Sequence, residues 1–335
     1  MKKIVFTIIL AAAAAVLVYR GELFTPKGKI IKRTRFLMDT VFTIQVPNSL
    51  GLRRTEAAME RAFDRMSEVD KKFNVLNQDS PAYRFNSERQ PISDPEIYSL
   101  VKAGTDISRE TGGAFDMTAF PLTETWGFFN HEIATRAVPS AGAIKGALSA
   151  VGWKRLSLRD GKVFPADARV KLDMGGIAKG YAIGEAVKVL KEAGITSALI
   201  LAGGQVQVFG SAGEGKPWRV GVRNPRREGY MAGLQFSEET GISTSGDYER
   251  FFEADGVRYH HIVDPRTGYP ARGLMSVSVI APDPVKADAL STALFVMGRD
   301  RALAFARKRP DIDVIIVDDK GKIFSSRENP AGAER

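Results

Sequence analysis

The sequence predicts an α+β protein, and three observations lead to that prediction. Strand-like segments follow one another closely, as at residues 198–201 and 206–209, and helical segments interrupt them. Residues 53–73 carry apolar side chains at three- and four-residue spacing, which is typical of a helix that buries one face. No fixed-period repeat or low-complexity tract is evident after the N-terminal segment. This mixture favours α+β over a doubly wound parallel sheet.

The other expected elements follow in chain order. A strand is expected over residues 36–46. A second helix begins after Ser93-Asp94-Pro95-Glu96, where a cap precedes a first-turn proline, and it ends at Gly112-Gly113. A third helix follows Ser140. Further strands are expected at residues 170–173, 198–201, 206–209, 218–222, 275–280 and 314–317, and further helices at 177–193, 287–297 and 299–309.

Composition narrows the class of protein. The chain has 335 residues, of which 44% are hydrophobic and 26% charged, as in an ordinary globular protein with a sizeable core. It has no cysteine, which excludes disulfides, zinc–thiolate sites, iron–sulfur clusters, thiol catalysis and a lipidated N-terminal cysteine. Any metal must therefore be held by oxygen or imidazole ligands.

The basic charge is concentrated near the N-terminus. Residues 1–35 carry eight Lys or Arg and one Glu, a charge of +7, so only +2 of the total +9 belongs to the remaining 300 residues. A nucleic-acid-binding body would carry its own basic patch, with a helix-turn-helix or an aromatic stacking platform, and neither is present in the sequence. We therefore expect no nucleic-acid partner.

The N-terminal segment predicts export. Met1-Lys2-Lys3 precedes an unbroken apolar run over residues 4–18, which is short for the roughly 20 residues of a membrane span. We expect residues 1–19 to be a signal peptide or an uncleaved membrane anchor, with 20–35 a basic linker, 36–327 the folded domain and 328–335 a polar tail. The expected location is the periplasm, with attachment to the bacterial inner membrane through the N-terminal segment.

Two segments could carry phosphate chemistry. In residues 172–181 an expected strand end, Gly175-Gly176, and a helix start bring free backbone N–H groups near Lys179. Glycines that merely permit a tight turn are the structural alternative.

Asp288 and Thr292 are four residues apart on an expected helix, so both could bind a hard cation from one face. Alternatively, Asp288 caps that helix and Thr292 bonds back to the preceding turn.

Two adjacent histidines, His260 and His261, precede a turn rich in proline and glycine. Neighbouring residues of a strand point to opposite faces, so at most one of them is expected to face a site. A structural role remains the default for His260.

Taken together, these segments resemble the ApbE family, the Mg²⁺-dependent FAD:protein FMN transferases. Seven motifs in the same order carry the resemblance over nearly all of the chain after residue 35: residues 36–40; 111–118, with Pro121-Leu122 and Trp126-Gly127-Phe128; 172–181; 202–204; 242–248; 261–270; and 287–298. The resemblance implies that a protein threonine or serine hydroxyl attacks the FMN-side phosphorus of FAD and that AMP leaves. The acceptors it implies are flavoprotein subunits of membrane electron-transfer complexes.

The resemblance also implies a site. Side-chain oxygens of Asp288 and Thr292, with carbonyls of Ser291 and Gly176, would bind Mg²⁺, although Mn²⁺ accepts the same oxygen ligands. Lys179 would stabilise the phosphate charge, and His261 would either take the acceptor's proton or position the flavin or phosphate. The residues implied in FAD binding are Met38, Leu76, Ala114, Phe115, Asp116, Asp173, Lys179 and Ile262.

The sequence departs from the family pattern at two places. Many relatives have a lipobox cysteine after the signal, which this chain lacks. Many also have an aromatic residue beside the FAD where this chain has Leu76, which cannot stack in the same way. The second departure leaves open an FAD pyrophosphatase that makes FMN and AMP. A non-catalytic flavin-binding protein is a further alternative, but it would not need the Asp288 and Thr292 pair.

Overall fold

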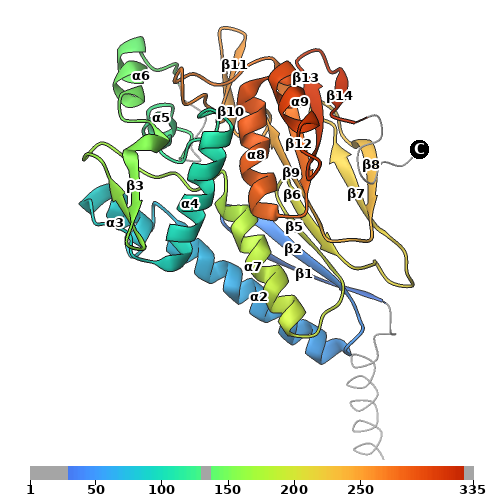
Figure 1. Cartoon of the computed structure of the whole chain (residues 1–335). Helices are drawn as coiled ribbons and strands as arrows, with labels where there is room; N and C mark the ends of the chain where they lie inside the picture. The colour runs from blue at the N-terminus through green and yellow to red at the C-terminus, as the bar shows by residue number, and fades with distance from the viewer. Residues whose placement is uncertain (1–28, 130–136, 328–335) are drawn as a thin grey trace, which may run out of the picture.

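The structure is a computed structural model that describes residues 29–129 and 137–327 (Figure 1). The expected signal or anchor at residues 1–19, most of the expected linker and the expected tail lie outside the described residues. Within the two described ranges, no helix is both long enough and apolar enough to cross a membrane.

An antiparallel eight-stranded sheet forms the centre of the molecule, in the order β1-β2-β5-β6-β9-β12-β13-β14. Its strands are β1 (Ile30–Leu37), β2 (Thr40–Pro47), β5 (Ala198–Ala202), β6 (Gln205–Phe209), β9 (Thr240–Gly246), β12 (Leu274–Ala281), β13 (Asp313–Asp318) and β14 (Ile323–Ser325). Three separate hairpins are β3 (Leu156–Arg159) with β4 (Lys162–Pro165), β7 (Trp218–Arg223) with β8 (Tyr230–Phe236), and β10 (Phe251–Ala254) with β11 (Val257–His260).

Helices cover one face of the sheet, and the β7–β8 hairpin packs on the other (Figure 1). The helices are α2 (Leu52–Phe73), α3 (Pro81–Glu88), α4 (Pro95–Glu110), α5 (Phe120–Thr125), α6 (Ala141–Leu148), α7 (Ala178–Glu192), α8 (Pro284–Met297) and α9 (Arg299–Arg307). A third apolar cluster joins α5 and α6 to the β10–β11 hairpin through Trp126, Phe128 and Phe252. The predicted α+β class is confirmed.

Local signals located most of the helices correctly. Asp94 caps α4 by accepting the N–H groups of Glu96 and Ile97, each at 3.0 Å, and Ser140 caps α6. The buried residues of α2 follow the spacing seen in the sequence, and Met59, Phe63 and Met66 are fully buried. The physical reason is that capping and helical periodicity depend on residues close in sequence.

The expected strand at residues 36–46 and the expected linker at 20–35 are both corrected at the first hairpin. β1 begins at Ile30 and pairs in register with β2, across a turn in which Met38 and Asp39 have φ of 48° and 59°. Such a two-residue turn with positive φ at both positions matches the twist of a hairpin. The basic residues Arg33 and Arg35 are therefore strand residues, not linker residues.

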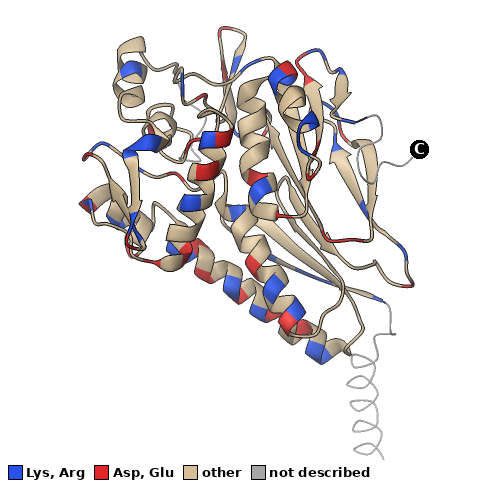
Figure 2. Cartoon of the chain, in the orientation of Figure 1, with Lys and Arg blue, Asp and Glu red and all other residues tan. Residues whose placement is uncertain are grey.

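These two arginines contact acidic residues of α2. Arg33 pairs with Glu56, and Arg35 pairs with Glu60 and Asp64, the latter at 2.9 Å. Figure 2 shows basic and acidic residues interspersed along α2. Acidic residues of α2 thus balance part of the positive charge near the N-terminus. Counting charges along the sequence did not reveal this pairing.

The expected strand at residues 170–173 is wrong. The backbone of Leu172 exchanges two hydrogen bonds with the side-chain amide of Asn86, at 2.7 and 2.8 Å, and Asp173 N donates to Met117 O at 2.6 Å. This segment therefore satisfies its polar groups through a buried asparagine and a loop rather than through a neighbouring strand. Its apolar alternation reflects burial without sheet pairing.

Helices α7 and α8 approach closely at Gly180. A Cβ atom at this position would lie 2.3 Å from the carbonyl oxygen of Pro284 and 2.9 Å from the Cα of Val285. We therefore expect Gly180→Ala to force the helices apart and to lower the free energy of unfolding by about 1–3 kcal/mol. Chemical denaturation measures this change.

Gly184, one turn later in α7, provides the matched control for that prediction. A Cβ there would meet only Pro284 Cγ at 3.5 Å, an ordinary contact. Because alanine also favours the helical state, Gly184→Ala should be neutral or stabilising by about 0.5–1 kcal/mol. Equal destabilisation by both substitutions would contradict the close-approach explanation.

Candidate active site

A cavity of about 570 Å³ lies between α7, α8, β9 and the loops that precede α5 and follow β11. It brings together segments that are distant in sequence, including the β1–β2 turn and the C-terminal end of α2. Twelve of the thirteen residues that the resemblance implies line it: Met38, Leu76, Ala114, Phe115, Asp116, Asp173, Gly176, Lys179, His261, Ile262, Asp288 and Thr292.

Asp288 and Thr292 lie one turn apart on α8 and both face the cavity. Asp288 is 4% exposed. Its Oδ2 accepts the backbone N–H of Gly180 at 2.9 Å, and its Oδ1 accepts the Ser243 hydroxyl at 3.3 Å. Gly176 approaches the same place, since a Cβ added there would lie 3.7 Å from Thr292 Oγ1. A carboxylate, a hydroxyl and a glycine backbone thus converge.

This donor set fits a hard divalent cation. Among the described residues, no group of three or more His, Cys, Asp or Glu side chains gathers that could hold a metal ion. A cation beside Asp288 would therefore take at most two such side chains from the described residues and fill its other positions with neutral oxygens, water and phosphate. Magnesium is typically bound in this way.

Ser291 does not line the cavity. It lies behind Asp288 and Thr292, the two residues that could bind a cation. It is 1% exposed, and its hydroxyl donates to the carbonyl of Asp288 at 2.8 Å and lies 2.8 Å from Ser245 Oγ. Ser245 Oγ in turn lies 3.3 Å from Thr292 Oγ1. Because Ser243 and Ser245 alternate along β9, both face α8 and support Asp288 and Thr292.

Lys179 extends over the turn that opens α7. Its Nζ donates to the carbonyl of Gly175 at 3.0 Å and lies 3.8 Å from Asp288 Oδ1. Asp173 holds the same turn, because its Oδ1 accepts the Gly175 N–H at 2.8 Å and its Oδ2 accepts the Thr123 hydroxyl at 3.2 Å. The turn therefore presents a lysine ammonium next to backbone N–H groups, an arrangement suited to phosphate.

Asp116 lines the cavity, but neighbouring groups occupy its carboxylate. It accepts hydrogen bonds from the N–H and hydroxyl of Thr118 and from the N–H of Trp153, at 2.6–2.8 Å. Burial raises the pKa of Asp116, while these hydrogen bonds oppose the rise. The arrangement indicates that Asp116 orders the loop that carries Ala114 and Phe115.

The two histidines have different environments. His260 is 4% exposed, and its Nε2 lies 2.7 Å from the Ala271 carbonyl, as expected of a structural residue; burial lowers its pKa to about 4. His261 follows the end of β11 and lines the cavity, and its Nδ1 is buried without a hydrogen-bond partner among the described residues. Burial, then the positive charge of Arg250, lowers the pKa of His261 well below 6.5. Its imidazole is therefore neutral at pH 7 and able to accept a proton.

The cavity is acidic overall. Among the residues that the structure describes, six carboxylates line it, against two lysine or arginine side chains, Lys179 and Arg250; the carboxylates belong to Asp39, Asp70, Asp116, Asp173, Glu249 and Asp288. A pyrophosphate would be repelled by this excess of negative charge unless a cation accompanied it. The charge balance thus independently favours a bound divalent metal.

Arg250 and Glu249 were missed by the sequence analysis, which did not anticipate the β10–β11 hairpin. A usable signal was present, because Asp255-Gly256 forms the two-residue turn of that hairpin with φ of 51° and 71°. Asp-Gly between alternating side chains is a strong hairpin signal. Recognising it would have paired residue 250 with His261.

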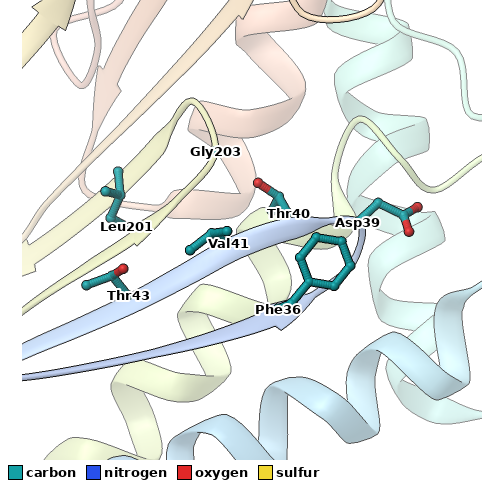
Figure 3. Close-up of a pocket in the computed structure, with 7 residues that line it drawn as sticks. All are labelled: Phe36, Asp39, Thr40, Val41, Thr43, Leu201 and Gly203. Atoms are coloured by element: carbon teal, nitrogen blue, oxygen red, sulfur yellow. The ribbon is translucent and has the colours of Figure 1, made fainter. Parts of the chain in front are cut away.

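A smaller hollow of about 430 Å³ adjoins the cavity at the β1–β2 turn (Figure 3). The two share Asp39, Thr40 and Gly203. Phe36 and Val41 also line the smaller hollow and are 70% and 52% exposed. None of the thirteen implied residues lines it, so it is separate from the candidate chemistry.

Comparisons with known proteins agree with this geometry. The FAD:protein FMN transferase of Treponema pallidum is 32% identical over 305 residues, covering 85% of this chain and 83% of that protein. The ApbE protein of Thermotoga maritima has 35% identity and a TM-score of 0.83, covering 89% of this chain and 97% of that one. The flavinyl transferase ApbE of Pseudomonas stutzeri has 31% identity and a TM-score of 0.79, with 91% and 96% covered.

The family model agrees with these relatives. The model described as the ApbE family matches residues 38–316, which includes every residue of the candidate site. The chain therefore belongs to the ApbE family.

Proposed function

We propose that this protein transfers FMN from FAD to a threonine or serine hydroxyl of an acceptor protein, in a Mg²⁺-dependent reaction that releases AMP. One observation carries the proposal most directly. Asp288, Thr292 and Lys179 converge in an acidic cavity where an anionic pyrophosphate needs both a metal and a fixed cation. The names of the related transferases support the same reaction class.

The proposed reaction forms one bond and breaks another at the FMN-side phosphorus. The acceptor oxygen bonds to phosphorus as the bridging P–O bond breaks, and the electron pair of the broken bond leaves with AMP. His261 accepts the hydroxyl proton, because its ring is neutral and lines the cavity, and its Nδ1 has no hydrogen-bond partner among the described residues. Lys179 stabilises the negative charge on the phosphate oxygens.

Asp288 and Thr292 would hold the metal ion, and Gly176, which lies beside Thr292, could add its backbone carbonyl. When bound, Mg²⁺ would supply electrostatic stabilisation of the phosphate oxygens. Ser243 and the Gly180 N–H fix the orientation of the Asp288 carboxylate by hydrogen bonding to it. This preset orientation limits the rearrangement that ion binding requires.

Hydrolysis of FAD to FMN and AMP is the second candidate. Leu76 favours it, because this residue is 51% exposed at the cavity and stands where the family resemblance expects an aromatic residue. Weaker flavin stacking there would leave more room for water. A non-catalytic flavin-binding protein is disfavoured, because it would not need the Asp288 and Thr292 pair.

The three functions can be separated in one experiment. The full-length protein in mild detergent is incubated with FAD, MgCl₂ and a flavoprotein subunit of a membrane electron-transfer complex, alone or with its acceptor threonine replaced by alanine. Transfer predicts an acceptor mass gain of one FMN together with AMP, both lost with the alanine acceptor. AMP without labelling indicates hydrolysis, and bound FAD without either product would refute an enzymatic function.

Leu76→Tyr is expected to tighten FAD binding by about threefold to tenfold, since an aromatic contact contributes about 0.5–1.5 kcal/mol beyond simple burial. It should also raise the ratio of transfer to hydrolysis. Quenching of flavin fluorescence measures the affinity. Leu76→Ala is the control and should not tighten binding; a gain of similar size in both variants would exclude stacking as the cause.

We also propose a periplasmic location with attachment to the inner membrane through the N-terminal segment. The apolar run at residues 4–18 after two lysines supports this proposal. The acceptors would then be flavoprotein subunits of membrane electron-transfer complexes. Fractionation of cells that produce the full chain, followed by carbonate washing, tests the attachment.

A further inference from the structure

Arg250 lies opposite His261 at the end of the β10–β11 hairpin. The strands pair Phe251 with His260, and the next residues continue the ladder, with His261 N donating to Arg250 O at 2.9 Å. Directly opposed residues of an antiparallel pair project to the same face. Both residues line the cavity, and the positive charge of Arg250 contributes to lowering the pKa of His261.

The Arg250 guanidinium retains most of its hydrogen-bonding capacity. Its one side-chain hydrogen bond within the described ranges is from Nη1 to the carbonyl of Phe128, at 3.2 Å, and it makes no ion pair with a described carboxylate. A guanidinium has five N–H donors. Lys179, which also lines the cavity, is already engaged with Gly175 and Asp288.

The contact with Phe128 holds Arg250 against a rigid surface. Phe128 stacks on Trp126 with ring centroids 6.1 Å apart and also contacts Phe252 of β10. Trp126 Nε1 donates to the carbonyl of Gly268 at 2.8 Å, which fixes the turn that follows His261. The aromatic cluster therefore supports both Arg250 and the segment after His261.

We propose that Arg250 binds the phosphate of the FMN half of the substrate, as a second fixed cation besides Lys179. The proposal rests on the proposed function. A base at His261 must contact the attacking hydroxyl, and that hydroxyl must approach the phosphorus to about 3–3.5 Å. The group opposite His261 is therefore next to the phosphate that is attacked. A planar guanidinium can bind two phosphate oxygens at once.

Flavin binding without metal or acceptor tests this contact. The full chain in detergent and EDTA is titrated with FMN and with riboflavin, which differ only in the phosphate, and flavin fluorescence is followed. Arg250→Ala should weaken FMN binding by about tenfold to a hundredfold and leave riboflavin binding unchanged. Arg250→Lys retains the positive charge but lacks the planar group that can bind two phosphate oxygens at once. It should therefore recover part of the lost FMN affinity.

The controls distinguish the possible failures. Arg301→Ala, at an exposed position of α9, should not change the affinity for either flavin. An equal loss of FMN and riboflavin binding in Arg250→Ala would show a structural role and overturn the proposal. Unchanged FMN affinity with a raised KM for the acceptor would assign Arg250 to the acceptor and also overturn it. If the wild-type protein bound FMN no more tightly than riboflavin, this proposal would be overturned, whereas the proposed function is tested separately by AMP release and acceptor labelling from FAD with Mg²⁺.

Discussion

Replacing Asp288 by alanine should abolish Mg²⁺-dependent release of AMP, with a fall in kcat of at least about a hundredfold. Asp288 is the carboxylate that faces Thr292 and Gly176, so its loss would remove the negative charge from the cation site. AMP release is measured over a range of MgCl₂ concentrations. The substitution should not be rescued by excess metal, because the remaining ligands are neutral.

The Asp288 carboxylate also has a structural role, so the variants must separate the loss of metal binding from a loss of stability. Asp288→Asn keeps the side-chain oxygen that can accept the Gly180 N–H, yet removes the charge. It should unfold close to the wild-type temperature but remain inactive. Asp300→Ala, at an exposed position of α9, serves as the charge control and should retain activity. Wild-type turnover in Asp288→Asn would remove Asp288 from the metal site.

His261→Ala should lower kcat for transfer by about a hundredfold to ten-thousandfold, the usual contribution of a general base. FAD affinity should stay within a few-fold of the wild type, since the proposed role of the ring is proton transfer. Stopped assays of acceptor labelling give kcat, and flavin fluorescence gives affinity. A pure loss of affinity would reassign His261 to flavin positioning.

The pH profile gives a second test of His261. Its pKa is lowered, so the neutral, base-competent form persists below pH 6.5 and is lost only as the pH falls through the lowered value. The acidic limb of kcat/KM should therefore lie below pH 6.5 in the wild type and disappear in His261→Ala. An acidic limb at or above pH 6.5 that survives the substitution would contradict the assignment.

The neighbouring histidine is the control for both measurements. His260→Gln removes a buried ring that contacts the Ala271 carbonyl and packs against Phe295. We expect a lower unfolding temperature with little change in kcat of the folded protein. A loss of kcat as large as that of His261→Ala would indicate that the effect comes from distortion of this strand end.

Sequence reasoning performed best where the cause of the structure is local. Asp94 caps the helix that follows it, and the spacing of Met59, Phe63 and Met66 places one face of α2 in the core. It failed where the partner is distant. The sequence around Leu172 predicts a strand, but the backbone of Leu172 is hydrogen-bonded to the side chain of Asn86, which is far away in sequence.

The candidate site shows the same division. Asp288 and Thr292 are neighbours on a helix, so spacing alone suggested a shared face. Their supporting residues could not be found that way, because Ser243 and Gly180 approach Asp288 from β9 and α7. Arg250 depends on strand pairing, which fixes its position opposite His261. Non-local pairing of this kind is set by the tertiary fold.

The close approach at Gly180 has a consequence for how the cavity works. Because this residue lacks a side chain, α7 can bring the Gly180 N–H to Asp288 and carry Lys179 to within 3.8 Å of the same carboxylate. The relative positions of the anion that would hold the metal and the cation that would hold the phosphate are thus fixed when the helices dock. The energetic cost of fixing these two charged groups in place is met during folding, so a substrate arrives at a preorganised electrostatic field.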